Sequence, residues 1–134
     1  MDKKQVKKIT WSKSVESALT RNQFTPDIIK ELRMYCTERN AEIFTVDTLT
    51  IITRPEGISA TEWEVVWMAS FGGGLKEHYK TFVKAAKRAG AKHIRFHISE
   101  ENELGVLRLI SDVKPYRVQE GVYRVDLAGV LNGS

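Results

Sequence analysis

The sequence predicts an α/β domain in which helices flank a mixed β-sheet. Three observations support this prediction. Segments rich in β-branched residues occur at 41–55 and 61–70. Apolar residues recur with helical spacing at 25–40 and 75–90. The middle of the chain reads strand, helix, strand, and is long enough for a crossover between parallel strands. With 134 residues, 42% of them hydrophobic and 28% charged, we expect one soluble domain over residues 1–134.

The first forty residues predict a basic arm followed by two helices. Lysines are frequent at about residues 1–8, which we interpret as a flexible, solvated arm, with a short strand in VKKITW. Ser12 or Ser14 can cap a short helix that follows. Thr25 can cap the next helix, and Pro26 fits its first position. Cys36 falls on the apolar face of that helix, so we expect it in the core.

The next segment is extended. Residues 41–55 form either a hairpin that turns at Asp47 and Thr48 or one long bent strand. Residues 61–70 form a strand whose alternation places two sets of side chains on opposite faces. One set is Trp63, Val65, Trp67 and Ala69, and the other is Glu64, Val66 and Met68. The later half of this strand is apolar on both faces, which predicts burial on both sides.

The second half of the chain alternates helices with strands. A helix over 75–89 ends at Gly90, and an alternating strand follows over 91–99. Ser99 can cap a further helix that has three glutamates in its first turn and ends before Pro115. The last predicted element is a strand or hairpin over 116–129, with Gly121 near its turn.

Three consecutive glycines, Gly72 to Gly74, join the strand over 61–70 to the helix over 75–89. Free backbone N–H groups and the helix dipole make such a corner a natural site for an anion. The Walker sequence GxxxxGK[ST] does not occur in this chain. A dinucleotide-binding loop would need a glycine where Glu77 stands. The turn is therefore an anion site of another kind, or only a sharp bend.

Residues 41–127 carry the order strand, glycine loop, helix, strand, helix, strand. Gly72 and Gly74 occupy the two small positions of the loop pattern [RQ]xxGx[GA], while Ala69 replaces its leading Arg or Gln. Asn102 is followed by an apolar helix. In this order and in these residues the chain resembles the GNAT N-acyltransferase superfamily. The resemblance implies a GNAT-like acyl-CoA N-acyltransferase fold. It departs from the family where a tyrosine is expected, near Leu109 or Ile110.

The resemblance also implies a cofactor and roles for individual residues. The cofactor would be acetyl-CoA or another acyl-CoA, and the second substrate an amine that the sequence does not identify. Pantetheine would lie where the strand over 63–69 splays from the strand over 93–98. It would pair with backbone near Met68 and Ala69. Pyrophosphate would bind the amides of Gly72, Gly73, Gly74 and Leu75, with Lys76 adding positive charge. Glu62 or Glu64 would deprotonate the amine, directly or through water, and Tyr116 would be a substitute acid.

Each of these residues also has a purely structural interpretation. Glutamates at a strand start, such as Glu62 and Glu64, are usually exposed to solvent. Tyr116 is a core or rim aromatic by the same reasoning. His93 and His97 share a strand face, but no third metal ligand is evident, so we expect no metal site.

Two other functions fit the sequence. A GNAT-like protein without catalysis could act as a structural or interaction protein with a protein partner. Small bacteriophage proteins, including virion-associated ones, look like this. The net charge of +4 and the pI near 9.2 also allow a nucleic-acid-binding domain. Its surface would comprise Lys84, Lys87, Arg88, Lys92 and Arg95. A single cysteine and the lack of a membrane-length apolar stretch favour a cytoplasmic protein with no membrane partner, or a virion-associated one.

Overall fold

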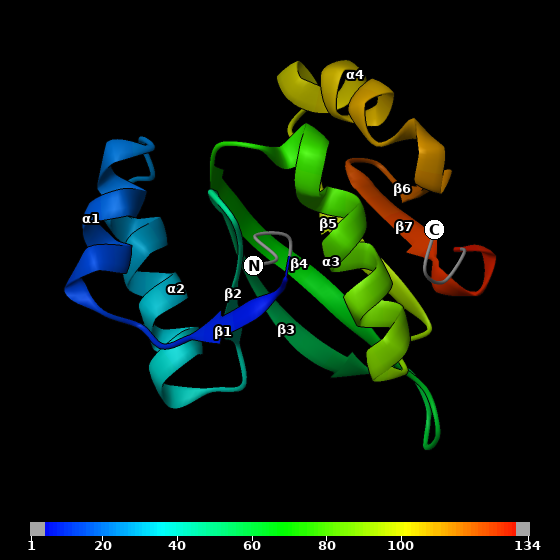
Figure 1. Ribbon diagram of the computed structural model, residues 1–134, viewed down its shortest axis with the longest axis horizontal. Helices are drawn as coiled ribbons and strands as arrows, with labels where there is room; N and C mark the ends of the chain where they lie inside the picture. Colours follow the sequence, from blue (N-terminus) through cyan, green and yellow to red (C-terminus); the bar gives the residue numbers. More distant parts are fainter. Residues whose placement is uncertain (1–4, 131–134) are drawn as a thin grey trace.

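The computed structural model describes residues 5–130 and shows a seven-stranded sheet in the order β1-β2-β3-β4-β5-β7-β6 (Figure 1). Only β4 and β5 pair in parallel, and the other neighbours are antiparallel. The predicted mixed sheet flanked by helices is confirmed. Its strands are β1 (Lys7–Ile9), β2 (Glu42–Val46), β3 (Leu49–Gly57), β4 (Trp63–Gly72), β5 (His93–His97), β6 (Tyr116–Gln119) and β7 (Val122–Asp126). The helices are α1 (Lys13–Arg21), α2 (Pro26–Glu38), α3 (Leu75–Ala89) and α4 (Glu100–Leu109), with 3-10 turns η1 (Ser111–Val113) and η2 (Leu127–Gly129).

The strand β1 takes up the end of the predicted N-terminal arm. Lys7 and Lys8 lie in β1, paired with β2, so the predicted flexible segment does not extend to residue 8. Pairing with Thr45 and Phe44 gives their backbone groups the hydrogen bonds that an arm would leave to water. Residues 1–4 lie outside the described part of the chain.

Local sequence signals set the helix starts. The Ser12 hydroxyl accepts a hydrogen bond from the Val15 N–H, which makes Ser12 rather than Ser14 the cap of α1. Thr25 caps α2 in the same way, and Pro26 takes the first helical position as predicted. Asp47 and Thr48 form the turn of a β2–β3 hairpin, so the alternative of one bent strand is wrong. The last two strands also form a hairpin, which turns beside Gly121.

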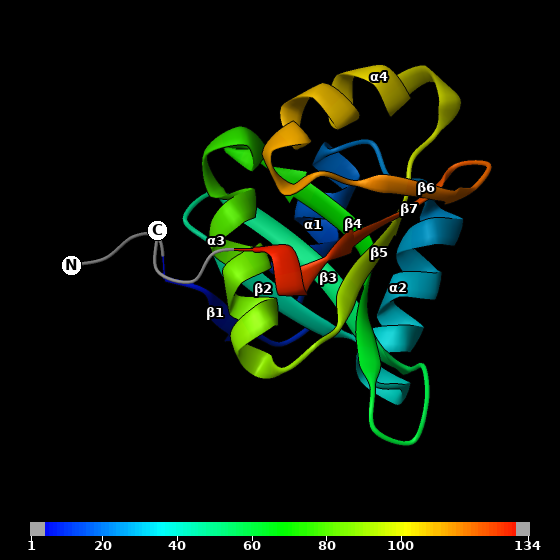
Figure 2. The ribbon, with the colours of Figure 1, turned by 90° about the vertical axis from the view of Figure 1, so that its right-hand side faces the viewer.

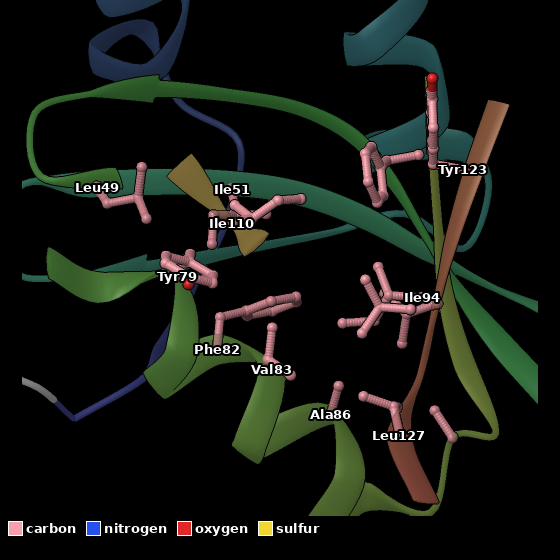
Figure 3. Close-up of a cluster of buried hydrophobic side chains, with 14 of the residues drawn as sticks. Leu49, Ile51, Tyr79, Phe82, Val83, Ala86, Ile94, Ile110, Tyr123 and Leu127 are labelled. Carbon is pink, nitrogen blue, oxygen red and sulfur yellow. The ribbon is translucent and has the colours of Figure 1, made fainter. Parts of the chain in front are cut away.

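The helices cover the two faces of the sheet unequally (Figures 1 and 2). On one face α3 packs over the middle of the sheet in a cluster that includes Phe82, Val83 and Ile94 (Figure 3). On the other face α1 and α2 cover only the half near β1 to β4, through Leu19 and Leu32. Cys36 is partly buried and packs against this second cluster, so it lies at the edge of the core rather than within it. The same face over β5 and β7 carries charged side chains instead.

The strand β4 does not alternate as predicted. Trp67 pairs with Thr53 and Ala69 pairs with Ile52, which leaves Met68 as an extra residue, a β-bulge. Trp67 packs with the α3 cluster, whereas Ala69 packs with the α1–α2 cluster. The prediction that these two residues share a face is therefore wrong. The bulge redirects the last part of β4 at the point where it leaves β5.

Candidate functional site

A cavity of about 440 Å³ opens where β4 and β5 diverge. The parallel pairing runs from Glu64 opposite His93 to Trp67 opposite Phe96. Within the described residues, β4 after Trp67 has no strand partner on its β5 side, so its backbone groups there are available to a ligand. The cavity is lined by residues of β4, β5, α3 and α4, together with Phe24 from the connection between α1 and α2. It therefore reaches both faces of the sheet.

The glycine turn is shaped by the β2–β3 turn beside it. Gly72 and Gly74 have φ of 89° and 88°. A Cβ on Gly72 would lie 2.2 Å from the Thr48 carbonyl oxygen, and one on Gly74 would lie 2.6 Å from the His78 ring. A Cβ on Gly73 would meet only the Thr48 hydroxyl, at 3.6 Å. The first and third glycines are thus required by the close approach of protein atoms, and the second is not.

The start of α3 has the features of an anion site. Gly74 is the N-cap of α3, and no side chain caps this helix end. The His78 N–H donates to the Gly74 carbonyl as the first bond of the helix. The preceding amides therefore face outward from the helix end, where the helix dipole favours an anion. Leu75 lines the cavity, and Lys76 is exposed next to it. The turn and the cavity are therefore adjacent.

Glu64 is buried, with an exposure of only 3%. Its carboxylate lies 2.9 Å from His93 Nδ1, 3.4 Å from Arg124 Nε and 3.6 Å from an Arg95 nitrogen. The expectation that Glu64 faces solvent is wrong, because two guanidinium groups from β5 and β7 offset the cost of burying its charge. Arg95 also bonds Glu56, so the charges form a network across four strands.

The other predicted catalytic side chains also lie away from the cavity lining. Glu62 is partly exposed and forms an ion pair of 3.1 Å with Lys92. Tyr116 is 41% exposed, and its hydroxyl donates to Asp126 at 2.8 Å. Its place at the rim rather than in the core agrees with the structural interpretation. Glu62, Glu64 and Tyr116 are thus not brought together at the cavity, and their catalytic roles stay predictions.

Burial lowers the pKa of His93 from its usual 6.5, with the Arg124 charge acting in the same direction against the opposing Glu64 carboxylate. The unfolded chain therefore binds a proton near pH 6.5 that the folded protein takes up only at lower pH. We expect the free energy of unfolding to fall as the pH drops below about 6.5, by up to ~1.4 kcal/mol per pH unit from this group. Urea denaturation at a series of pH values from 7.5 to 5.0 measures this change in the free energy of unfolding. His93→Gln should flatten the curve, and an unchanged slope in this variant would show that His93 does not cause the loss of stability.

Besides Ser70 on β4, three polar residues near β5 and α4 line the cavity and had not been assigned to the site from the sequence. His97, Ser99 and Asn102 line it at the end of β5 and the start of α4. His97 is exposed, and the Asn102 amide donates to the Ser99 hydroxyl at 2.9 Å. The one available signal in the sequence was their place at the end of the alternating strand and in the first turn of the helix that follows it. No metal-binding group of His, Cys, Asp and Glu occurs within residues 5–130.

The predicted nucleic-acid surface is not one surface. Lys84, Lys87 and Arg88 lie on α3. Arg95 alternates with Ile94 and Phe96, which pack under α3, so Arg95 points to the opposite face of the sheet. Lys92 forms an ion pair with Glu62. These charges therefore do not form the single basic face that a nucleic-acid contact would use.

We compared the sequence and the fold of this chain with those of known proteins. No family model matches the sequence, and no match was found among curated proteins. Among solved structures, a chain of the NatC complex bound to Gag peptide and CoA superposes with a TM-score of 0.56 at 11% identity, over 92% of this chain and 95% of that one. The chain has the GNAT fold. A mutant of a cAMP-binding acyltransferase from Mycobacterium smegmatis matches with a TM-score of 0.50 at 12% identity, over 93% of this chain and 44% of that one.

This chain spans less than half of the mycobacterial protein. What it shares with both solved structures is the GNAT fold. The expected GNAT-like fold is confirmed, including the order of elements from β4 to β7. Among residues 5–130, no helix has the length and apolar character needed to cross a bilayer.

Proposed function

We propose that this protein is an acyl-CoA-dependent N-acyltransferase. The observation that carries the proposal is the cavity in which the unpaired edge of β4 meets the uncapped start of α3. A ligand with amide groups and phosphates finds a complementary surface there. The structurally similar NatC complex is described as bound to CoA and a peptide, which supports this choice of ligand.

The residues present fit an acyl-CoA. Backbone groups near Met68 and Ala69 are unpaired on the side toward β5 and would bind the amides of pantetheine. The amides of Gly73, Gly74 and Leu75, at the positive end of α3, would bind pyrophosphate, and Lys76 would add charge. Gly73 leaves room for this approach, because it has no side chain and only the Thr48 hydroxyl lies near the place of its missing Cβ. The bound thioester supplies an activated acyl group.

Transfer to an amine requires that the amine lose a proton. Histidine is the side chain that most often acts as general base, and His97 lines the cavity and is exposed. Glu64 is instead held among three nitrogen-bearing side chains and outside the cavity lining. We therefore assign proton abstraction to His97, with Glu62 and Glu64 as the alternatives that the GNAT resemblance implies.

Acetyl-CoA is expected to stabilise the protein. At 100 times its Kd, a ligand that binds only the folded state adds about 2.7 kcal/mol, which for a chain of this size raises Tm by roughly 8 °C. Gly73→Asp should abolish this shift, because it places a negative charge among the phosphate-binding amides. Gly73→Ala should keep it, because a Cβ fits there. Differential scanning fluorimetry with acetyl-CoA up to millimolar concentration measures both variants.

The matched alanine variant separates loss of binding from loss of folding. If both Gly73 variants lose the shift equally, the turn does not bind phosphate through its charge. If the wild-type protein shows no shift at millimolar acetyl-CoA, the proposal is wrong.

A second candidate function is a GNAT-fold protein that has lost catalysis and serves as a structural or interaction protein. The observation in its favour is that Ile110, near the position of the family tyrosine, is buried and cannot donate a proton. Binding of acetyl-CoA without transfer to any free amine, in an assay of released CoA thiol over a peptide panel, would favour this candidate.

A further inference from the structure

The cavity has an inner wall made only of aliphatic side chains. We define the inner wall as the part lined by Val83, Ile94, Ile110, Val113 and Val125. Val83, Ile94 and Val125 are at most 3% exposed, and Ile110 is 8% exposed. Figure 3 shows Val83 on α3 facing Ile94 on β5 within this cluster. This end of the cavity is therefore shielded from solvent, unlike the end near His97.

The inner wall is chemically suited to an aliphatic group. Protein interiors are close-packed, and voids larger than a water molecule are few. A buried water needs two to four polar partners, whereas the side chains of the inner wall offer none. The polar lining residues Ser70, His97, Ser99 and Asn102 lie at the ends of β4 and β5 and at the start of α4 instead, and the remaining hydroxyl of the lining belongs to Tyr79, one turn of α3 before Val83. The cavity thus has one polar end and one aliphatic end.

The two ends lie in order along α3. Leu75, at the phosphate-binding start of the helix, and Val83, in the inner wall, are separated by about 12 Å at a rise of 1.5 Å per residue. An acyl-CoA held by its phosphates at the start of α3 and by pantetheine along β4 would carry its acyl group into the cavity. The aliphatic surface beneath α3 lies farther in.

We infer that the acyl group is an aliphatic chain longer than acetyl, which packs against the inner wall between α3, β5 and η1. This inference rests on the proposed function and names the donor substrate of the same site. A two-carbon acyl group reaches little of this surface, whereas a chain of medium length buries its methylenes against valine and isoleucine side chains. Each buried methylene strengthens binding about fourfold.

The test is the dissociation constant of a series of CoA thioesters, measured by isothermal titration calorimetry on the full chain. The probes are CoA and its acetyl, butanoyl, hexanoyl and octanoyl thioesters. We expect affinity to rise with chain length and octanoyl-CoA to bind at least ~100-fold more tightly than acetyl-CoA, after the cost of ordering the chain. Equal affinities across the series would overturn the inference and leave the proposed function intact. Failure of every probe, CoA included, would overturn both.

Larger side chains in the inner wall test whether it causes the dependence of affinity on acyl chain length. Val83→Phe should remove the gain for octanoyl-CoA and keep the affinity for CoA. Val113→Phe, in the half-buried η1 turn, is a second filling variant in case the first does not fold. Val118→Phe makes the same exchange at an exposed position of β6 and should behave as wild type. If affinity still rises with acyl chain length in both filling variants, the acyl chain binds elsewhere and the inference is wrong.

Discussion

Replacement of Glu64 by glutamine is expected to lower the free energy of unfolding by about 2–4 kcal/mol. Glutamine keeps the shape of the side chain but removes the charge that faces Arg95, Arg124 and His93. Removal of one partner from a buried ion pair typically costs about 3–5 kcal/mol. The expected loss is smaller than this, because the two arginine side chains are about one quarter exposed and water screens part of their charge. Urea denaturation at pH 7.5 measures the loss.

The neighbouring Glu62 supplies a matched control. Glu62→Gln removes an exposed ion pair with Lys92, so its effect on stability should stay within about 0.5 kcal/mol. Equal stability of the two variants would show that the Glu64 network contributes little to the fold. If Glu64→Gln kept full stability yet lost acyl transfer, Glu64 would be the general base and the assignment to His97 would be wrong.

Replacement of His97 by alanine is expected to slow acyl transfer by about 10²–10⁴-fold, the usual contribution of a positioned general base. His97 is exposed, so the substitution removes little packing and the free energy of unfolding should change by less than about 0.5 kcal/mol. The assay is release of CoA thiol from acetyl-CoA or octanoyl-CoA with peptides that have free amino termini.

The melting-temperature shift with acetyl-CoA provides the control for His97→Ala. It should match that of wild type, because the residues proposed to bind phosphate and pantetheine are unchanged. An unaltered rate in a protein that transfers acyl groups would exclude His97 as the base. Loss of the acetyl-CoA shift together with the rate would show that His97 contributes to binding rather than to proton transfer.

The helices and hairpins were predictable because their signals are local. Thr25 followed by Pro26 starts α2 regardless of what packs against it, and Asp47 with Thr48 turns the β2–β3 hairpin. The glycine turn was also located correctly, since glycine adopts the positive φ seen at Gly72 and Gly74 without steric strain. The fold class then followed from the order of the elements.

The site was less predictable because it depends on contacts between distant segments. Glu64 is buried by virtue of Arg95 and Arg124, which lie 31 and 60 residues later in the chain. The bulge at Met68 breaks the two-residue period on which the assignment of faces relied. His97 became a candidate only when the divergence of β4 from β5 placed it on the cavity. No local pattern encodes these three features.

The short parallel pairing between β4 and β5 also divides the sheet mechanically. Nine residue pairs join β3 to β4, whereas only four join β4 to β5. The sheet therefore consists of two antiparallel groups of strands, β1 to β4 and β5 to β7, which are joined by this short parallel ladder. Among the ladders that join interior strands, the one between β4 and β5 is the shortest, so a small rotation of one group against the other would change the width of the opening between them at the cost of few backbone hydrogen bonds. A long flexible ligand could enter this protein without the unfolding of any helix.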